Sequence, residues 1–172
     1  MKENRMIRLI DELDLEPITF KLVHPELDET NMSVEKADEL IEKYRRFLKL
    51  CAMYPERSIV PSKEIDQVWH VHILDTAKYA ADCDAIFGFL LHHFPYFGLR
   101  GAADLEHLHN EAAETRQLYM EHFSEDMFDG SIKNVDSSCS SAPTCTGDCS
   151  PSCQPSGLVR ASLGERPRLV RS

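Results

Sequence analysis

An amphipathic segment at residues 34–53 constrains the fold of this chain most strongly. Its sequence is VEKADELIEKYRRFLKLCAM, and its apolar residues recur at the three- and four-residue spacing of one helical face. Ser33 stands at the N-cap position, Glu35 lies in the first turn, and Tyr54-Pro55 ends the pattern. The segment predicts a long helix that buries one face against other helices.

Further segments with helical spacing define the expected architecture. They span residues 4–15, 63–73, 75–93 and 102–123, and Ser62 and Asp75 are the expected N-caps of the middle two. The segment ITFKLVHP is expected to be extended or irregular, because Pro25 disfavours helix at His24. Short loops and the lack of an alternating strand pattern predict an all-α fold, a compact bundle of about four to five helices.

The charge distribution divides the chain near Asp136. Residues 1–136 carry 15 Lys and Arg against 27 Asp and Glu, a net charge of −12, whereas residues 137–172 have a net charge of +2. The second part is rich in Ser, Pro, Gly and Cys and offers almost nothing to bury. We therefore expect a helical domain at 1–136 and a flexible, disordered tail at 137–172.

Composition also limits the expected partners and location. The net charge of the 172 residues is −10, and an acidic surface repels phosphate backbones, so nucleic acid is not an expected partner of the folded domain. No apolar run approaches the roughly 20 residues that cross a bilayer, so no membrane association is expected. The charged N-terminus lacks the apolar core of a signal peptide, which favours a cytoplasmic location.

A histidine-rich stretch, DQVWHVHILDTAKYAADCDAIFGFLLHH at residues 66–93, contains the candidate site. On the helix at 63–73, His72 falls on the apolar face between Val68 and Trp69. Asp66 and His70 are four residues apart and stack on the flank of that face. Buried imidazole and carboxylate groups are costly unless their polar atoms are satisfied, and a metal ion is one way to do so.

The spacing of His70 and His72 sets a geometric condition on a shared site. They are about 200° apart on an ideal helix, so both can bind one ion only if the helix loosens after His70. The helix boundary expected at Asp75 places such a break nearby.

On the expected helix at 75–93, His93 lies at the edge of the apolar face and His92 points away. Asp82 is about 16 Å back along that helix, so it pairs locally or approaches the chain near His72.

Two interpretations of these residues remain open. In the first, Asp66, His70, His72 and His93 bind a divalent metal, with Trp69, Tyr79 and Asp82 around the site. Mixed histidine and carboxylate ligands suit Zn or Fe. In the second, the histidines are structural core residues, and Asp66 sets a tautomer.

Other motifs carry weaker signals. Glu106 and His109 have the spacing of a di-iron ligand pair, but a second such pair is missing. The tail cysteines could wrap one soft metal, form redox-labile disulfides or have no fixed role; they are Cys139, Cys145, Cys149 and Cys153. Four common enzyme motifs, GxSxG, GxGxxG, HExxH and the P-loop, are absent.

The spacing of the histidine-rich stretch resembles a known family. The pattern consists of Asp66, Trp69, His70, His72, Tyr79, Asp82, Gly88 and His93. It is similar to the glycine-rich domain-containing protein-like family, and the flanking sequence over about residues 18–125 resembles its short bacterial members. The chain has no glycine-rich region of the plant type, and the resemblance implies no agreed reaction.

These observations predict a helical metal-binding protein, and an enzyme of the oxidoreductase or hydrolase class is the activity that such a site would serve. The alternatives are a non-enzymatic interaction module with structural histidines, and metal storage or trafficking through the cysteine tail.

Overall fold

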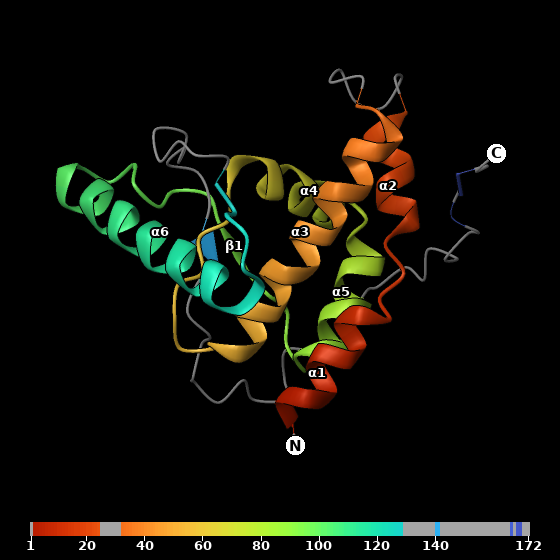
Figure 1. Cartoon of the computed structure of the whole chain (residues 1–172), viewed down its shortest axis with the longest axis horizontal. Coiled ribbons are helices and arrows are strands. Elements are labelled where there is room, and N and C mark those ends of the chain that lie inside the picture. The colour runs from red at the N-terminus through yellow and green to blue at the C-terminus, as the bar shows by residue number, and fades with distance from the viewer. Residues whose placement is uncertain (1, 25–31, 129–139, 142–165, 167, 170–172) are drawn as a thin grey trace, which may run out of the picture.

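Six helices make up most of the described chain. The computed structural model describes residues 2–24, 32–128, 140–141, 166 and 168–169 (Figure 1). The helices are α1 (Lys2–Asp11), α2 (Glu16–Val23), α3 (Val34–Met53), α4 (Lys63–Leu74), α5 (Thr76–Ile86) and α6 (Ala102–Phe123). Two short strands, β1 (His93–Phe94) and β2 (Ser140–Ser141), pair antiparallel. The predicted all-α class is confirmed.

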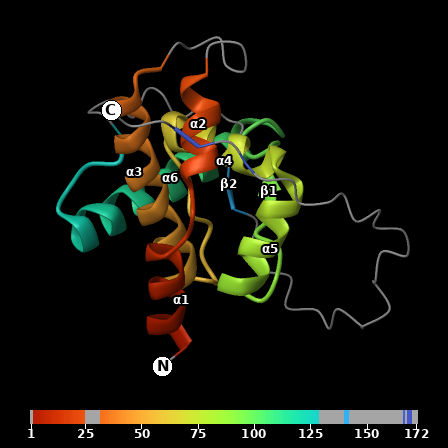
Figure 2. The ribbon, with the colours of Figure 1, turned by 90° about the vertical axis from the view of Figure 1, so that its right-hand side faces the viewer.

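Helix α3 occupies the centre of the fold. The Ser33 hydroxyl accepts a hydrogen bond from the Lys36 amide at 3.2 Å, as an N-cap does. In Figures 1 and 2 the other helices gather around α3, and α1, α2, α4 and α6 all pack against it. Tyr44 and Phe47 on α3 are fully buried, and Phe47 packs on the buried Trp69 of α4. The core therefore forms where α3 faces α4.

Helices α4 and α5 follow each other with only Asp75 between them. Ser62 caps α4 by accepting from the Ile65 amide, and Asp75 caps α5 by accepting from the Lys78 amide, both at 3.3 Å. The two N-caps agree with the sequence prediction. Asp75 is also the C-cap of α4, so the chain changes direction at one residue.

The segment that begins at Glu16 is helical, and the prediction of an extended or irregular 18–25 is wrong. Pro17 lies in the first turn of α2, where an amide hydrogen has no partner within the helix. Ile18 and Leu22, one turn apart, are buried in the core. Only His24 has extended backbone angles (φ −83°, ψ 113°), as a residue before proline prefers.

The predicted helix at 75–93 ends seven residues early. Gly88 has φ +81°, and its amide bonds the carbonyls of Cys83 and Asp84, which closes the last turn of α5. The chain then runs through an irregular segment to His93 in β1, which pairs with Ser141 of β2. His93 is therefore not a helical residue.

Helix α6 is the most peripheral element. Its first turns extend away from the other helices in Figure 1, and its C-terminal part lies near α3. No helix in the described residues is long and apolar enough to cross a bilayer. The tail cysteines Cys139, Cys145, Cys149 and Cys153 lie outside the described residues.

Candidate metal centre

Helix α4 supplies two of the polar side chains at the site. Asp66 and His70 are one turn apart on the same flank, and His70 Nδ1 lies 3.5 Å from Asp66 Oδ2. The Asp66 side chain is 11% exposed and the His70 side chain is 50% exposed, so the pair runs from the core edge to the surface.

His93 reaches the same point from β1. Its Nε2 lies 3.0 Å from Asp66 Oδ1 and 3.0 Å from His70 Nε2. Its ring packs against the Trp69 ring, with centroids 4.7 Å apart, and its side chain is only 9% exposed. A residue 23 positions after His70 thus completes a two-histidine, one-carboxylate group.

Asp66 and His70 both lie within hydrogen-bonding distance of one atom, His93 Nε2, which restricts the hydrogen bonds that the three residues can form. An imidazole nitrogen carries either one hydrogen or one lone pair, so Nε2 cannot donate to Asp66 and also accept from His70. With a metal–nitrogen distance of about 2.1 Å, two ligand atoms at a right angle lie about 3.0 Å apart, and about 3.4 Å in a tetrahedron. The observed separations of 3.0 Å match ligands around one ion.

His72 lies apart from this group because α4 continues without a break to Leu74. Its Nε2 is 2.9 Å from Asp82 Oδ2, and its Nδ1 is 2.9 Å from the Tyr44 hydroxyl. Burial lowers the pKa of His72, although Asp82 opposes the shift.

The neutral tautomer of His72 follows from these partners. The Asp82 carboxylate can only accept, so Nε2–H of His72 donates to it and Nδ1 accepts from Tyr44. Both ring nitrogens are thus used by protein groups. The loosening after His70 that a shared four-ligand site requires is absent, and the structure does not bring His72 to the other three residues.

Asp82 and Lys78 complete the surroundings of His72. Asp82 Oδ2 also accepts from Lys78 Nζ at 2.7 Å, and the Lys78 side chain is 9% exposed. The sequence alternative that placed Asp82 near His72 agrees with this geometry. The sequence does not mark Lys78 as part of a site, because a lysine on a helix is usually exposed to solvent. It does not mark Tyr44 either, because the helical spacing assigns Tyr44 to the core.

Tyr79 links α4 to the segment that precedes His93. Its hydroxyl accepts from Trp69 Nε1 at 2.9 Å and donates to the carbonyl of Leu91. Burial raises the pKa of Tyr79, so the hydroxyl stays protonated and can donate. Trp69 and Tyr79 therefore hold the chain two residues before His93.

The other sequence candidates are not part of this group. In the described portion of the chain, Asp66, His70 and His93 are the only group of three histidine, cysteine or acidic side chains close enough together to bind one metal ion. Glu106 and His109 are both exposed, and His92 is exposed beside His93. Gly88 was the signal that could have located His93 correctly, because glycine commonly follows the end of a helix.

The described part of the chain is therefore an all-α protein with a histidine–aspartate group compatible with a divalent metal. The chain belongs to the UCP032817-like family, whose family model matches residues 5–126. No curated protein and no solved structure matches the chain. The resemblance to the glycine-rich domain-containing protein-like family is wrong, since the pattern from Asp66 to His93 lies inside a match to a different family.

Proposed function

We propose that this protein binds one divalent transition-metal ion through Asp66, His70 and His93 and uses it in catalysis. The observation that carries the proposal is the position of His93 Nε2, 3.0 Å from an oxygen of Asp66 and from a nitrogen of His70. Without a metal, His93 Nε2 cannot donate to Asp66 and also accept from His70. A cation bound between the three side chains would interact favourably with all of them.

The exposure of the site supports a catalytic rather than a structural metal. Structural zinc sites have four protein ligands, whereas catalytic sites keep a position for water or substrate. Here three ligands are available, and the half-exposed His70 opens the group to solvent. Substrate would thus reach the ion from the His70 side.

The ligand set suits two ions with different chemistry. Two histidines and one carboxylate form the facial ligand set of non-haem Fe(II) oxygenases, which would make the protein an oxidoreductase. Zinc with the same ligands would lower the pKa of a bound water, which would make it a hydrolase.

The metal content of the full-length protein tests this proposal. After anaerobic purification and elemental analysis, we expect about one Fe or Zn per chain, the stoichiometry of a single three-ligand site. His70→Ala and His93→Ala should each lower this content at least tenfold. His92→Ala is the matched control, because His92 is exposed next to His93 and outside the group. Circular dichroism should show that all variants remain helical.

A second candidate function, a non-catalytic module with structural histidines, is favoured by one observation. The Asp66–His93 contact also ties β1 to α4, so the group would hold the fold without any ion. If no metal binds wild type, even after anaerobic reconstitution with Fe(II) and Zn(II), and His93→Ala still lowers stability, the catalytic proposal is wrong.

Metal storage or trafficking through the tail remains a separate prediction. The full-length chain with Cys139, Cys145, Cys149 and Cys153 changed to Ser tests it. Metal that remains bound after this change but is lost in His70→Ala is bound by the histidine–aspartate group. Metal that is lost after this change but remains in His70→Ala is bound by the tail cysteines.

A further inference from the structure

The end of the chain contacts the helical part through two arginines. Arg166 places Nε 2.5 Å and Nη2 2.9 Å from the two carboxylate oxygens of Asp75. Arg168 contacts both oxygens of Asp14, one of them at 2.7 Å, and lies 3.2 Å from Glu16 Oε2. Both guanidinium groups therefore bind a carboxylate in the two-pronged geometry that lysine cannot adopt.

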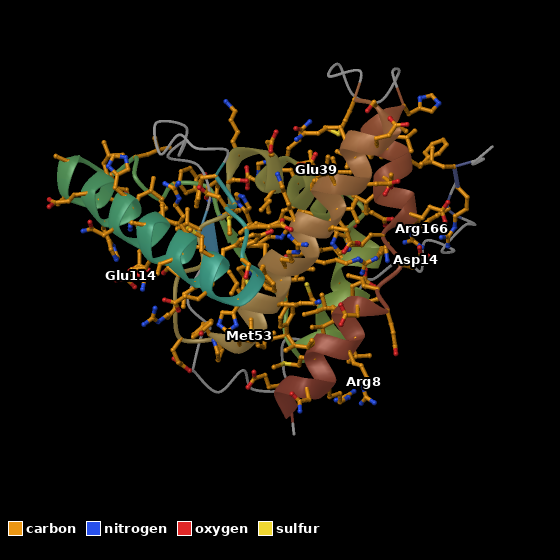
Figure 3. All side chains as sticks on the ribbon, in the orientation of Figure 1. Arg8, Asp14, Glu39, Met53, Glu114 and Arg166 are labelled. Atoms are coloured by element: carbon orange, nitrogen blue, oxygen red, sulfur yellow. The ribbon has the colours of Figure 1, made fainter. Side chains whose placement is uncertain are left out.

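The three acidic residues come from two different helix junctions. Asp14 and Glu16 lie where α1 gives way to α2, and Asp75 lies between α4 and α5. We call these three residues the acidic junction surface. Figure 3 shows Asp14 and Arg166 next to each other at the same edge of the molecule, and the charge of Asp14 contributes to the raised pKa of Arg166.

Backbone contacts hold the two aspartates independently of the arginines. Asp14 Oδ1 accepts from the Glu16 amide, and Asp75 Oδ1 accepts from the Lys78 amide as the cap of α5, both at 3.3 Å. Each carboxylate is thus oriented before an arginine arrives, which lowers the entropy cost of binding.

The charge balance of the chain supports the same contact. Residues 1–136 have a net charge of −12, and the sequence from 137 onward has a net charge of +2 that comes from four arginines. Two of these arginines, separated by one residue, meet the acidic junction surface. Each arginine of the Arg-x-Arg pair meets one of the two aspartates.

We propose that the acidic junction surface is a binding site for Arg-x-Arg segments, filled in this protein by its own Arg166 and Arg168. An Arg-x-Arg segment from another molecule would bind only when Arg166 and Arg168 have released Asp75 and Asp14. The site shares no residue with the group of Asp66, His70 and His93, so this inference does not depend on metal binding.

A labelled peptide of sequence GERPRLVRS, residues 164–172, tests the proposal on the full-length protein. We expect it to bind the Arg166→Ala/Arg168→Ala variant about fivefold more tightly than wild type, measured by fluorescence anisotropy. In wild type the tethered segment competes at an effective concentration of about 1 mM. Binding should weaken as salt is added.

Control variants separate this contact from general charge attraction. Asp14→Asn together with Asp75→Asn, added to the double variant, should abolish binding, and asparagine still caps α5. Asp84→Asn, an exposed charge elsewhere on α5, should leave binding unchanged. A peptide with lysine in place of Arg166 and Arg168, and Arg171 unchanged, should bind several-fold more weakly.

Three results would overturn the proposal. The first is no binding to the double variant up to about 1 mM peptide, the concentration scale of a tethered segment. The second is equal binding to wild type and double variant. The third is a wild-type dimer in light scattering that the double variant loses, since the segment would then occupy a second copy.

Discussion

At the scale of single residues, Tyr79 connects the core to the candidate metal centre. Its hydroxyl is shared between the indole N–H of Trp69 and the carbonyl of Leu91. Trp69 in turn packs against the ring of His93. The position of His93 therefore depends on a residue that does not belong to the three-residue group.

Tyr79→Phe removes this hydroxyl and keeps the ring. Two buried polar groups lose their partner, so we expect a loss of about 1–3 kcal/mol in the free energy of unfolding. Metal affinity should fall about tenfold or more, as for other residues that position a ligand. Urea unfolding of the metal-free protein and metal titration measure the two effects.

Tyr54→Phe provides the control for this substitution. The Tyr54 hydroxyl bonds His122 Nε2 at 2.7 Å in an exposed position, where water can replace it. Its loss should cost less than about 0.5 kcal/mol. Equal losses for the two variants would contradict the role given to Tyr79.

At the scale of elements, the end of α5 decides where His93 lies. Had the helix continued to residue 93, as its spacing predicted, His93 would have risen along the helix axis away from Asp66. Gly88 adopts φ +81°, which ends the helix and lets the chain return to α4. Periodicity alone does not report such a stop, because the apolar residues after Gly88 still fit the helical spacing.

Gly88→Ala should therefore be destabilising although the space around it is open. A Cβ at Gly88 would meet nothing within 4 Å, so the cost comes from the left-handed backbone conformation alone. We expect about 1–2 kcal/mol from thermal or urea unfolding. Gly88→Asn should cost clearly less, because asparagine tolerates this conformation, and identical costs would show that backbone strain is not the cause.

Helix α2 shows how packing overrides a local signal. Pro25 restricts only His24, while Ile18 and Leu22 bury one face of the preceding segment. Pro25 is therefore not evidence against helix over the whole of residues 18–25. Its effect reaches one residue back.

At the scale of the whole molecule, the arginine contacts join residues more than 90 positions apart. The pKa of Asp75 is lowered, mainly by its hydrogen bond to Arg166, and that of Asp14 mainly by its hydrogen bond to Arg168. Lys78 adds to both shifts through its charge, and Glu16 shares Arg168. Because the folded state lowers the pKa of both carboxyl groups, the contact stabilises the folded chain at pH values above 3.8, the ordinary pKa of an aspartate.

The stability of wild type relative to Arg166→Ala/Arg168→Ala should therefore depend on pH. Both aspartates are about a third or more exposed, so solvent screening limits the difference at pH 7 to about 1 kcal/mol. The difference should shrink as pH falls from about 4 towards 3, because the two carboxyls take up protons. Urea unfolding of both proteins across this range measures it. A difference that persists undiminished at pH 3 would contradict this origin.

The sequence by itself determined the all-α class, the long central helix, the caps at Ser33, Ser62 and Asp75, and the pairing of Asp66 with His70. These follow from local periodicity and from side chains that act within one turn. The short spacing pattern from Asp66 to His93 did not identify the family, which the match over residues 5–126 shows to be the UCP032817-like family.

Only the tertiary structure decided which residues meet across the fold. His93 contacts Asp66 and His70. His72 instead bonds Tyr44 and Asp82, and Arg166 binds Asp75. Each of these contacts depends on where a helix stops and how the chain then returns, and no local pattern encodes that path. The partners of a histidine were thus set by the backbone turn at Gly88 as much as by the histidine's own position.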